Sequence, residues 1–206
     1  MKKLLCVLLC VLMLISLAAC AKNNPDDTPE NNTDTITIVD HGNNTVTVPR
    51  DIKRVVVCDI FPLPSVLTVF FDSADKLIGI APTSMAAAKN GLLSELYPEI
   101  LDAKTDFMTG NQVNTEELAK LQPDVVFYSA NNTKQGETLR TAGFNAVGIS
   151  ANNWGYNAIE TLNQWIALLS QMFPDNNRAD IVKSYSEQIF NMVKERTSGI
   201  DNNDKA

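Results

Sequence analysis

Histidine is almost absent from this sequence, since His41 is the only one among its 206 residues. Histidine is the commonest metal ligand and a frequent general base, so one copy offers little from which to build a metal centre or a catalytic triad. The sequence also contains no glycine-rich phosphate loop, no Gly-x-Ser-x-Gly elbow and no His/Cys cluster with metal-ligand spacing. We therefore expect no catalytic residue and no metal ligand, and we do not expect an enzyme.

Basic residues are also few. There are 17 lysines and arginines against 24 acidic residues, and the net charge of −7 becomes −9 when Lys2 and Lys3 of the N-terminal segment are left out. Nucleic-acid binding needs a clustered basic face, so nucleic acid is excluded as a partner. Glycine and proline, nine residues each, are too scarce for a disordered or collagen-like chain, and 45% hydrophobic residues are enough for a packed core.

The N-terminus has the pattern of an export signal. Two lysines precede a run, residues 4–19, in which only Ser16 is not apolar, and small residues close this run at Leu17-Ala18-Ala19-Cys20. As a helix these sixteen residues would span about 24 Å, which is shorter than the roughly 30 Å hydrocarbon core of a bilayer. We therefore predict that residues 1–19 are a cleaved signal peptide and not a membrane span.

The Leu-Ala-Ala-Cys sequence resembles the lipobox of bacterial lipoproteins. The resemblance implies that Cys20 carries a lipid and anchors the exported chain to the outer face of the bacterial cytoplasmic membrane; an ordinary secretory signal with an incidental cysteine is the alternative. Residues 20–35 are mostly Asn, Asp, Pro and Thr and predict a flexible tether. Cys58 would then be alone in an apolar strand, where a cysteine behaves as a small buried hydrophobe.

Strand and helix patterns alternate over residues 36–156, the predicted N-terminal lobe. Residues 35–40 and 45–49 alternate polar and apolar side chains and predict a β-hairpin, with His41 solvated in its turn. Short apolar runs predict four strands, and the segments between them predict helices. The strands are expected at 54–58, 77–80, 125–128 and 146–149, and the helices at 65–71, about 86–94, 115–121 and 136–142. This alternation predicts a doubly wound, mostly parallel α/β sheet.

The pattern becomes purely helical over residues 157–197. Ile159, Leu162, Ile166 and Leu169 lie at helical spacing on one face of a first helix, and Pro174 ends it. A second, longer amphipathic helix runs to residue 197 and is followed by a polar stretch, residues 198–206. We interpret this stretch as a linker to a lobe that is absent.

Ligands of open α/β sheets bind beyond the carboxyl ends of the strands, so the segments after the predicted strands are the candidate site. These segments contain aromatic rings, hydroxyls, amides and a methionine, which suit a sizeable organic ligand. The candidate ligand-binding residues are Phe61, Ser84, Met85, Tyr128, Asn131, Trp154 and Tyr156. The alternative is that the rings belong to the core or rim of a small domain. Asp59 also follows a strand but has no partner base, so we interpret it as a turn residue.

Three segments together carry a family resemblance: the predicted hairpin leading into Pro49–Val57 (PRDIKRVVV), then Leu77–Ile80 (LIGI), then Asn114–Val126 (NTEELAKLQPDVV). From about residue 35 to 197 the chain resembles the iron-siderophore and vitamin B12 class of ABC-transporter substrate-binding proteins. The resemblance implies two α/β lobes joined by one long helix, here residues 176–197, with the ligand held between the lobes. The C-terminal lobe is lacking, so we interpret the chain as truncated.

The resemblance also implies a function and partners. The ligand would be a ferric siderophore, haem or cobalamin, with no covalent cofactor apart from the lipid, and the partners would be an ABC permease and its ATPase. Glu95 and Glu99 are candidates for permease docking by region only, and solvated surface carboxylates are the alternative. Two other functions stay open: a secreted α/β enzyme whose catalytic half is missing, and a receptor for a bare metal ion.

Overall fold

The computed structural model describes residues 34–200 of the chain. The signal peptide predicted for residues 1–19, the lipid-bearing Cys20 and nearly all of the predicted tether lie outside the described residues, as do positions 201–206 of the predicted linker. The described residues belong to one compact unit, which begins at Asp34.

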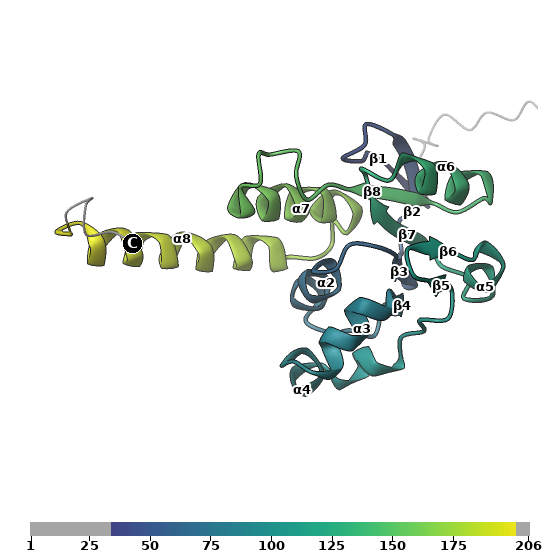
Figure 1. The fold of residues 1–206 in the computed structure, drawn as a ribbon. Coiled ribbons are helices and arrows are strands. Elements are labelled where there is room, and N and C mark those ends of the chain that lie inside the picture. Colours follow the sequence, from purple (N-terminus) through teal and green to yellow (C-terminus); the bar gives the residue numbers. More distant parts are fainter. Residues whose placement is uncertain (1–33, 201–206) are drawn as a thin grey trace, which may run out of the picture. The chain divides into compact units, whose positions relative to one another are not determined.

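A four-stranded sheet lies at the centre of this unit (Figure 1). Its strands are β3 (Val55–Val57), β4 (Leu77–Ile80), β7 (Val125–Ser129) and β8 (Ala146–Ile149), in the order β4-β3-β7-β8, and every neighbouring pair is parallel. All residues of β3 and β8 are buried, as expected for strands that are covered on both faces. The predicted parallel α/β sheet is confirmed.

Helices alternate with these strands. They are α2 (Leu63–Phe71) after β3, α3 (Pro82–Lys89) after β4, α5 (Thr115–Lys120) before β7 and α6 (Thr133–Thr141) after β7. The side-chain oxygen of Asn114 caps α5 by accepting hydrogen bonds from the backbone N–H groups of Glu116 and Glu117, at 3.0 and 3.2 Å. The two glutamates lie in the first turn, where their charge favours the helix dipole.

Two predicted helices had wrong boundaries. The segment expected as one helix at about 86–94 forms α3 and a short α4 (Leu93–Leu96), because Asn90 and Gly91 end α3. A 3₁₀ helix, η1 (Pro98–Asp102), follows and was not predicted. Helix α6 begins three residues before the expected start because Asn132 caps it, with its Oδ1 accepting from the N–H of Gln135 at 3.2 Å.

The N-terminal hairpin has the predicted strands, β1 (Thr35–Val39) and β2 (Thr45–Pro49), which pair antiparallel. Asp40, at the end of β1, is buried and joins the hairpin to the sheet, because its Oδ2 accepts from the N–H of Gly148 in β8 at 2.7 Å. A second hairpin, β5 (Met108–Thr109) and β6 (Gln112–Val113), was not predicted, because two-residue strands leave no readable alternation.

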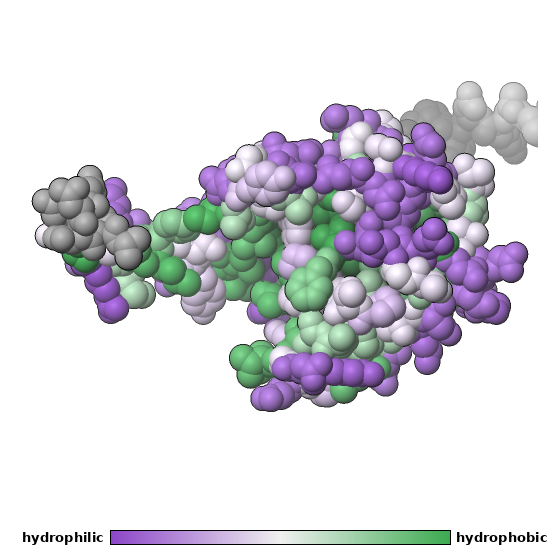
Figure 2. All heavy atoms as spheres, in the orientation of Figure 1, coloured by the Kyte–Doolittle hydropathy of each residue, from purple (hydrophilic) through white to green (hydrophobic). Residues whose placement is uncertain are grey.

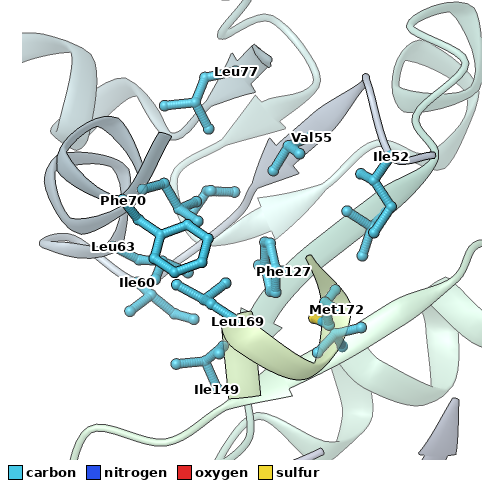
Figure 3. Close-up of a cluster of buried hydrophobic side chains, with 14 of the residues drawn as sticks. Ile52, Val55, Ile60, Leu63, Phe70, Leu77, Phe127, Ile149, Leu169 and Met172 are labelled. Carbon is cyan, nitrogen blue, oxygen red and sulfur yellow. The ribbon is translucent and has the colours of Figure 1, made fainter. Parts of the chain in front are cut away.

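Two clusters of buried side chains pack against opposite faces of the sheet. Val55 and Val57 of β3 belong to the larger cluster, whereas Val56 belongs to the smaller one, as the alternation of side chains along a strand requires. Figure 3 shows part of the larger cluster, with Ile52, Val55, Ile60, Leu63, Phe70, Leu77, Phe127, Ile149, Leu169 and Met172 labelled. Cys58 is fully buried in the smaller cluster, as predicted.

The chain ends in two long helices, α7 (Ala158–Met172) and α8 (Arg178–Thr197). Of the four apolar residues predicted to share one face of α7, only Leu169 is buried, while Ile159 and Leu162 are 50% and 37% exposed. The residues of α7 that are buried are Thr161, Trp165, Leu168, Leu169 and Met172. All of these except Thr161 belong to the larger cluster, together with residues of α2 and of the sheet.

None of the twenty residues of α8 is buried, although apolar side chains recur along the helix. Figure 2 shows hydrophobic side chains gathered along α8 and toward α7. Between the two helices lies a groove of about 730 Å³, lined by apolar residues that include Leu162, Ile166, Ile189 and Phe190. Over residues 34–200, no helix combines the length and the apolar composition needed to cross a membrane.

Candidate ligand-binding surface

The carboxyl ends of the four parallel strands meet at one edge of the sheet. After β3 the chain goes first to β4 on one side and then returns to β7 and β8 on the other, so the strand order reverses between β3 and β7. In open α/β sheets this switch point, outside the carboxyl ends of the strands, is where ligands bind. The loops after β3 and β7 flank it, the loop after β8 is joined to the loop after β7, and the turn of the N-terminal hairpin is joined to the loop after β8.

Asp59 fixes the loops on the two sides of the switch point. Its Oδ1 accepts from the N–H of Ser129 at 2.7 Å, and its Oδ2 accepts from Nδ2 of Asn132 at 3.3 Å. The Asn132 amide also donates to Oε1 of Gln135 at 2.7 Å. The carboxylate of Asp59 therefore joins the end of β3 to the end of β7, which agrees with its interpretation as a turn residue.

Phe61 and Ser84, both predicted site residues, are joined by a hydrogen bond. Oγ of Ser84 donates to the backbone carbonyl of Phe61 at 3.2 Å, and Ser84 is buried while Phe61 is 57% exposed. The hydroxyl therefore positions the backbone of Phe61, and the ring of Phe61 is left at the surface. A small pocket of about 260 Å³, lined largely by carbon atoms, lies between Phe61, Ser84 and the residues around Leu92.

Met85 and Tyr128 do not reach this surface. Met85 is 6% exposed within the larger cluster, and Tyr128 is 1% exposed within the smaller one. The hydroxyl of Tyr128 accepts from Nη1 of Arg140 at 3.0 Å and from Nδ2 of Asn44 at 3.4 Å. Their placement on a ligand-contacting surface is therefore corrected, because each of these two side chains faces packed neighbours.

The loop from Ser150 to Asn157 carries two further predicted residues, Trp154 and Tyr156. Tyr156 is 81% exposed and has a backbone φ of 59°, in the left-handed region. Trp154 is half-buried and packs against the larger cluster. The predicted residue Asn131, in the loop after β7, donates from Nδ2 to Oδ1 of Asn152 at 2.8 Å. The structure thus brings Asn131, Trp154 and Tyr156 together on the β7–β8 side.

Ser150 holds this loop in place. Its Oγ accepts from the N–H groups of Asn152 and Asn153 at 3.3 and 3.1 Å, and its carbonyl accepts from Nε1 of Trp165 in α7 at 2.6 Å. Ser150 is itself fully buried. The loop that carries Trp154 is therefore anchored at its first residue by side-chain and backbone hydrogen bonds.

His41 also belongs to this surface, and its prediction as a solvated turn residue was wrong. Its Nδ1 accepts from the N–H of Ser150 at 3.2 Å, and its ring meets the ring of Trp154 edge-on, with centroids 4.9 Å apart. Burial lowers the pKa of His41 below its ordinary value, although a backbone hydrogen bond at Gln164 and the charge of Asp40 both act to raise it. The contact joins positions more than a hundred residues apart, so no local sequence signal indicates it.

We define the strand-end surface as the exposed or half-buried residues that these loops bring to the carboxyl edge of the sheet. They are His41, Phe61, Asn131, Asn152, Asn153, Trp154 and Tyr156. Aromatic faces and amide groups allow stacking and hydrogen bonding with an organic molecule. Within residues 34–200 no group of three or more His, Cys, Asp or Glu side chains is placed to hold a metal ion.

The two predicted docking glutamates differ in their surroundings. Glu95 is exposed on α4 between Leu92 and Leu96, which are also exposed. Oε1 of Glu99 instead accepts from the N–H of Ala74 at 3.0 Å, and this backbone hydrogen bond lowers the pKa of Glu99. The hydrogen bond of Glu99 therefore links η1 to the segment that precedes β4. No such hydrogen bond to the backbone is found for Glu95 among the described residues.

Solved structures share this fold. A periplasmic solute binding protein from Veillonella parvula is 24% identical, with a TM-score of 0.71, and the match covers 82% of this chain and 50% of that protein. The molybdate-binding protein MolA of Haemophilus influenzae is 22% identical, with a TM-score of 0.66 and coverages of 82% and 55%. The petrobactin-binding protein YclQ of Bacillus subtilis is 17% identical, with a TM-score of 0.60 and coverages of 81% and 55%.

The chain therefore spans about half the length of these solved structures. Comparison with curated proteins gave no match. Residues 69–206 match a family described as periplasmic binding protein, and this match takes in α3 to α8 and the strand ends of β4, β7 and β8. Because the match extends over more than half of the sequence, the chain belongs to the periplasmic binding protein family.

Proposed function

We propose that this chain is part of an extracytoplasmic receptor that binds an iron chelate, either a ferric siderophore or haem, or a corrinoid such as cobalamin, and delivers it to an ABC permease and its ATPase. The observation that carries the proposal is the strand-end surface. It offers the rings of Phe61, Trp154 and Tyr156 at the edge of the sheet where open α/β proteins bind ligands.

The chemistry of this surface favours a large ligand over a small ion. Aromatic rings contribute contact area and stacking. Asn131 and Asn153 each donate from the amide NH₂ to a partner within the protein, so their amide oxygens are the groups that can accept a hydrogen bond from a ligand, whereas Asn152 uses its amide oxygen and can donate from its NH₂. Compact ions are held instead by convergent charged or metal-ligating side chains. Relatives of the same fold bind both kinds of ligand, since one is named for molybdate and another for the siderophore petrobactin. The side chains of this chain support the organic chelate.

Half of the proposed binding cleft would come from a second lobe, as expected from the length of the solved relatives. Helix α8 would join the two lobes, and the apolar groove between α7 and α8 would lie beside the junction. Attachment to the membrane through Cys20, and docking to the permease through Glu95, also belong to the proposal. The exposed position of Glu95 is compatible with this contact.

Equilibrium titration tests the proposal, with the protein produced together with whatever sequence follows Ala206 in its gene. The ligands are haemin, cyanocobalamin, a ferric catecholate siderophore, a ferric hydroxamate siderophore and molybdate. We expect one chelate or corrinoid to bind and molybdate not to bind. Failure of every organic ligand, or binding of molybdate alone, would contradict the proposal.

Two variants locate the site. Trp154→Ala and Tyr156→Ala should each weaken binding by about 3- to 10-fold, because an aromatic contact contributes about 0.5–1.5 kcal/mol beyond its buried area. The control is Tyr185→Ala on α8, which removes another exposed tyrosine ring, 62% exposed against 81% for Tyr156, from a residue outside the strand-end surface. Equal effects of Tyr156→Ala and Tyr185→Ala would show that the ligand binds elsewhere.

A further inference from the structure

The hairpin turn and the Ser150–Asn157 loop are joined by three contacts that all involve His41. Nδ1 of His41 accepts from the N–H of Ser150, the carbonyl oxygen of His41 accepts from Nδ2 of Asn153 at 3.0 Å, and the imidazole meets the ring of Trp154 edge-on at 4.9 Å. The backbone N–H of His41 adds a fourth link, since it donates to the carbonyl of Gly148 in β8 at 3.0 Å.

We propose that His41 is a positioning residue of the ligand-binding surface: its neutral imidazole holds the Ser150–Asn157 loop, and with it Trp154, in the orientation that contacts ligand, and protonation of the ring releases this loop. The inference rests on the function proposed above, because it is Trp154 and Tyr156 that would touch the ligand. It adds a pH dependence that the strand-end surface by itself does not imply.

The release follows from the hydrogen-bond geometry. With Nδ1 as an acceptor, the single ring proton is on Nε2. Protonation places a second N–H at Nδ1, directly opposite the N–H of Ser150, so that two donors face each other. Ser150 is fully buried, so its N–H gains no replacement partner from solvent unless the loop moves. Trp154, four residues further along, moves with it.

The groups around the ring do not cancel this effect. Asp40, on the hairpin itself, is the charged neighbour that would favour the imidazolium, but its carboxylate already accepts from the N–H groups of Gly42, Asn44 and Gly148. From α7 the neighbour is the backbone at Gln164. The side chain of Gln164 donates from Nε2 to the carboxylate of Glu160 at 2.8 Å, so this carboxylate already has a partner on its own helix. The loop itself contributes Trp154 and asparagines, which do not titrate.

Two variants separate the acceptor from the charge. His41→Asn places an amide oxygen close to the position of Nδ1, so it keeps an acceptor for Ser150 but cannot titrate in this range. His41→Ala removes the acceptor. The 206-residue chain is studied in detergent, where two readouts need no ligand: amide hydrogen exchange of residues 150–157, and tryptophan emission as a function of pH. Since the chain has two tryptophans, Trp154→Phe assigns the emission.

We expect the wild-type emission to change with a midpoint below pH 6.5, and this change to be absent in His41→Asn and in Trp154→Phe. At pH 7.5 the amides of the loop should exchange at least about fivefold faster in His41→Ala than in His41→Asn, which should resemble the wild type. A midpoint at or above 6.5, or loop exchange that is the same in both variants, would overturn the proposal.

Binding of haemin and cyanocobalamin then separates the two proposals, measured at pH 7.5 and at about one pH unit below the emission midpoint of the wild type, with the protein that includes the sequence following Ala206. If His41 positions the site, the wild type should bind about fivefold more weakly at the lower pH, and His41→Asn should not show this loss. Equal losses in both proteins would overturn the link to ligand. If the loop responds as expected but neither these ligands nor the ferric siderophores bind at any pH, the receptor function fails and the role of His41 in positioning the loop stands.

Discussion

The loss of the Asp40 side chain should destabilise this protein strongly. It is 3% exposed, and both carboxylate oxygens are occupied. Oδ1 accepts from the N–H groups of Gly42 and Asn44, both at 2.8 Å, and Oδ2 accepts from the N–H of Gly148 at 2.7 Å. One side chain thus closes the hairpin turn and attaches the hairpin to β8.

The cost of Asp40→Ala can be worked out from these donors. The N–H of Gly148 lies in a buried bond, and a buried donor left unpaired costs about 1–3 kcal/mol. The two turn donors are reached by water more easily, so each should cost about 1 kcal/mol. We therefore expect a loss of about 3–5 kcal/mol from the free energy of unfolding, which is a large part of the roughly 5–15 kcal/mol typical of a domain.

Asp40→Asn should cost less, about 1–3 kcal/mol. The amide oxygen can still serve the turn, but the amide NH₂ then faces the N–H of Gly148, donor against donor. The matched control is Asp106→Asn, which neutralises an exposed carboxylate and should change stability by no more than about 0.5 kcal/mol.

Urea unfolding followed by far-UV circular dichroism measures these differences. With a slope of about 2 kcal/mol per molar urea, Asp40→Ala should lower the midpoint by about 1.5–2.5 M. A midpoint within about 0.5 M of the wild type, at unchanged slope, would refute the reasoning, because it would mean that the hairpin is attached without this carboxylate.

Three further predictions concern packing and ionisation. Gly148→Ala should destabilise by about 1–3 kcal/mol in the same assay, because a Cβ there would lie 2.9 Å from Oδ2 of Asp40 and 3.1 Å from the hydroxyl of Tyr128, whereas Gly199→Ala meets no atom within 4 Å and should be neutral. The folded state holds the pKa of His41 below 6.5, so the contribution of the neutral imidazole to the free energy of unfolding should be complete above that pH and decline as the pH falls toward the folded pKa. Between pH 7.5 and 5.5 the urea midpoint of the wild type should therefore fall more than that of His41→Asn, and an equal or smaller fall would count against this prediction. Burial raises the pKa of the Cys58 thiol, so the peptide containing Cys58 should stay unlabelled by iodoacetamide at pH 8 until guanidinium is added, as mass spectrometry of the digest would show.

The sheet could be predicted from sequence because its strands are buried on both faces. Such strands have continuous apolar runs, as in Val55-Val56-Val57 of β3 and Ala146–Ile149 of β8. The first run extends through Cys58 and lies between Arg54 and Asp59, and the second lies between Asn145 and Ser150. The hairpin was equally readable, because β1 and β2 alternate buried and exposed residues. Boundaries failed where a helix starts in a polar segment: Asn132 caps α6, but it stands in an Asn-Asn pair that also suits a loop.

The candidate site could be predicted only in part, for two physical reasons. The rule that ligands bind beyond the strand ends correctly located Phe61, Asn131, Trp154 and Tyr156 at an accessible edge. The rule could not exclude Tyr128, because the sequence predicted that the strand ends at residue 128. In the structure β7 continues to Ser129, so Tyr128 lies within a strand that is covered on both faces, and its ring is buried. The rule also could not find His41, whose partners Ser150 and Trp154 are brought to it by the docking of the hairpin on β8.

Helix α7 shows that hydrophobic periodicity places apolar residues on one face of a helix without showing what that face packs against. The helix has two apolar stripes: Trp165, Leu168 and Met172 pack into the core, while Ile159, Leu162 and Ile166 turn toward α8. Periodicity shows that an apolar stripe of a helix packs against other apolar side chains, but it does not show which element supplies them. The second stripe and the apolar residues of α8 line one groove, and α8 leaves side chains such as Ile189 and Phe190 about half exposed. In the proposed receptor, the second lobe would cover these apolar side chains. The same second lobe would supply the other wall of the ligand cleft, opposite the strand-end surface, so one hypothesis accounts both for the exposed apolar residues of α8 and for the open strand-end surface.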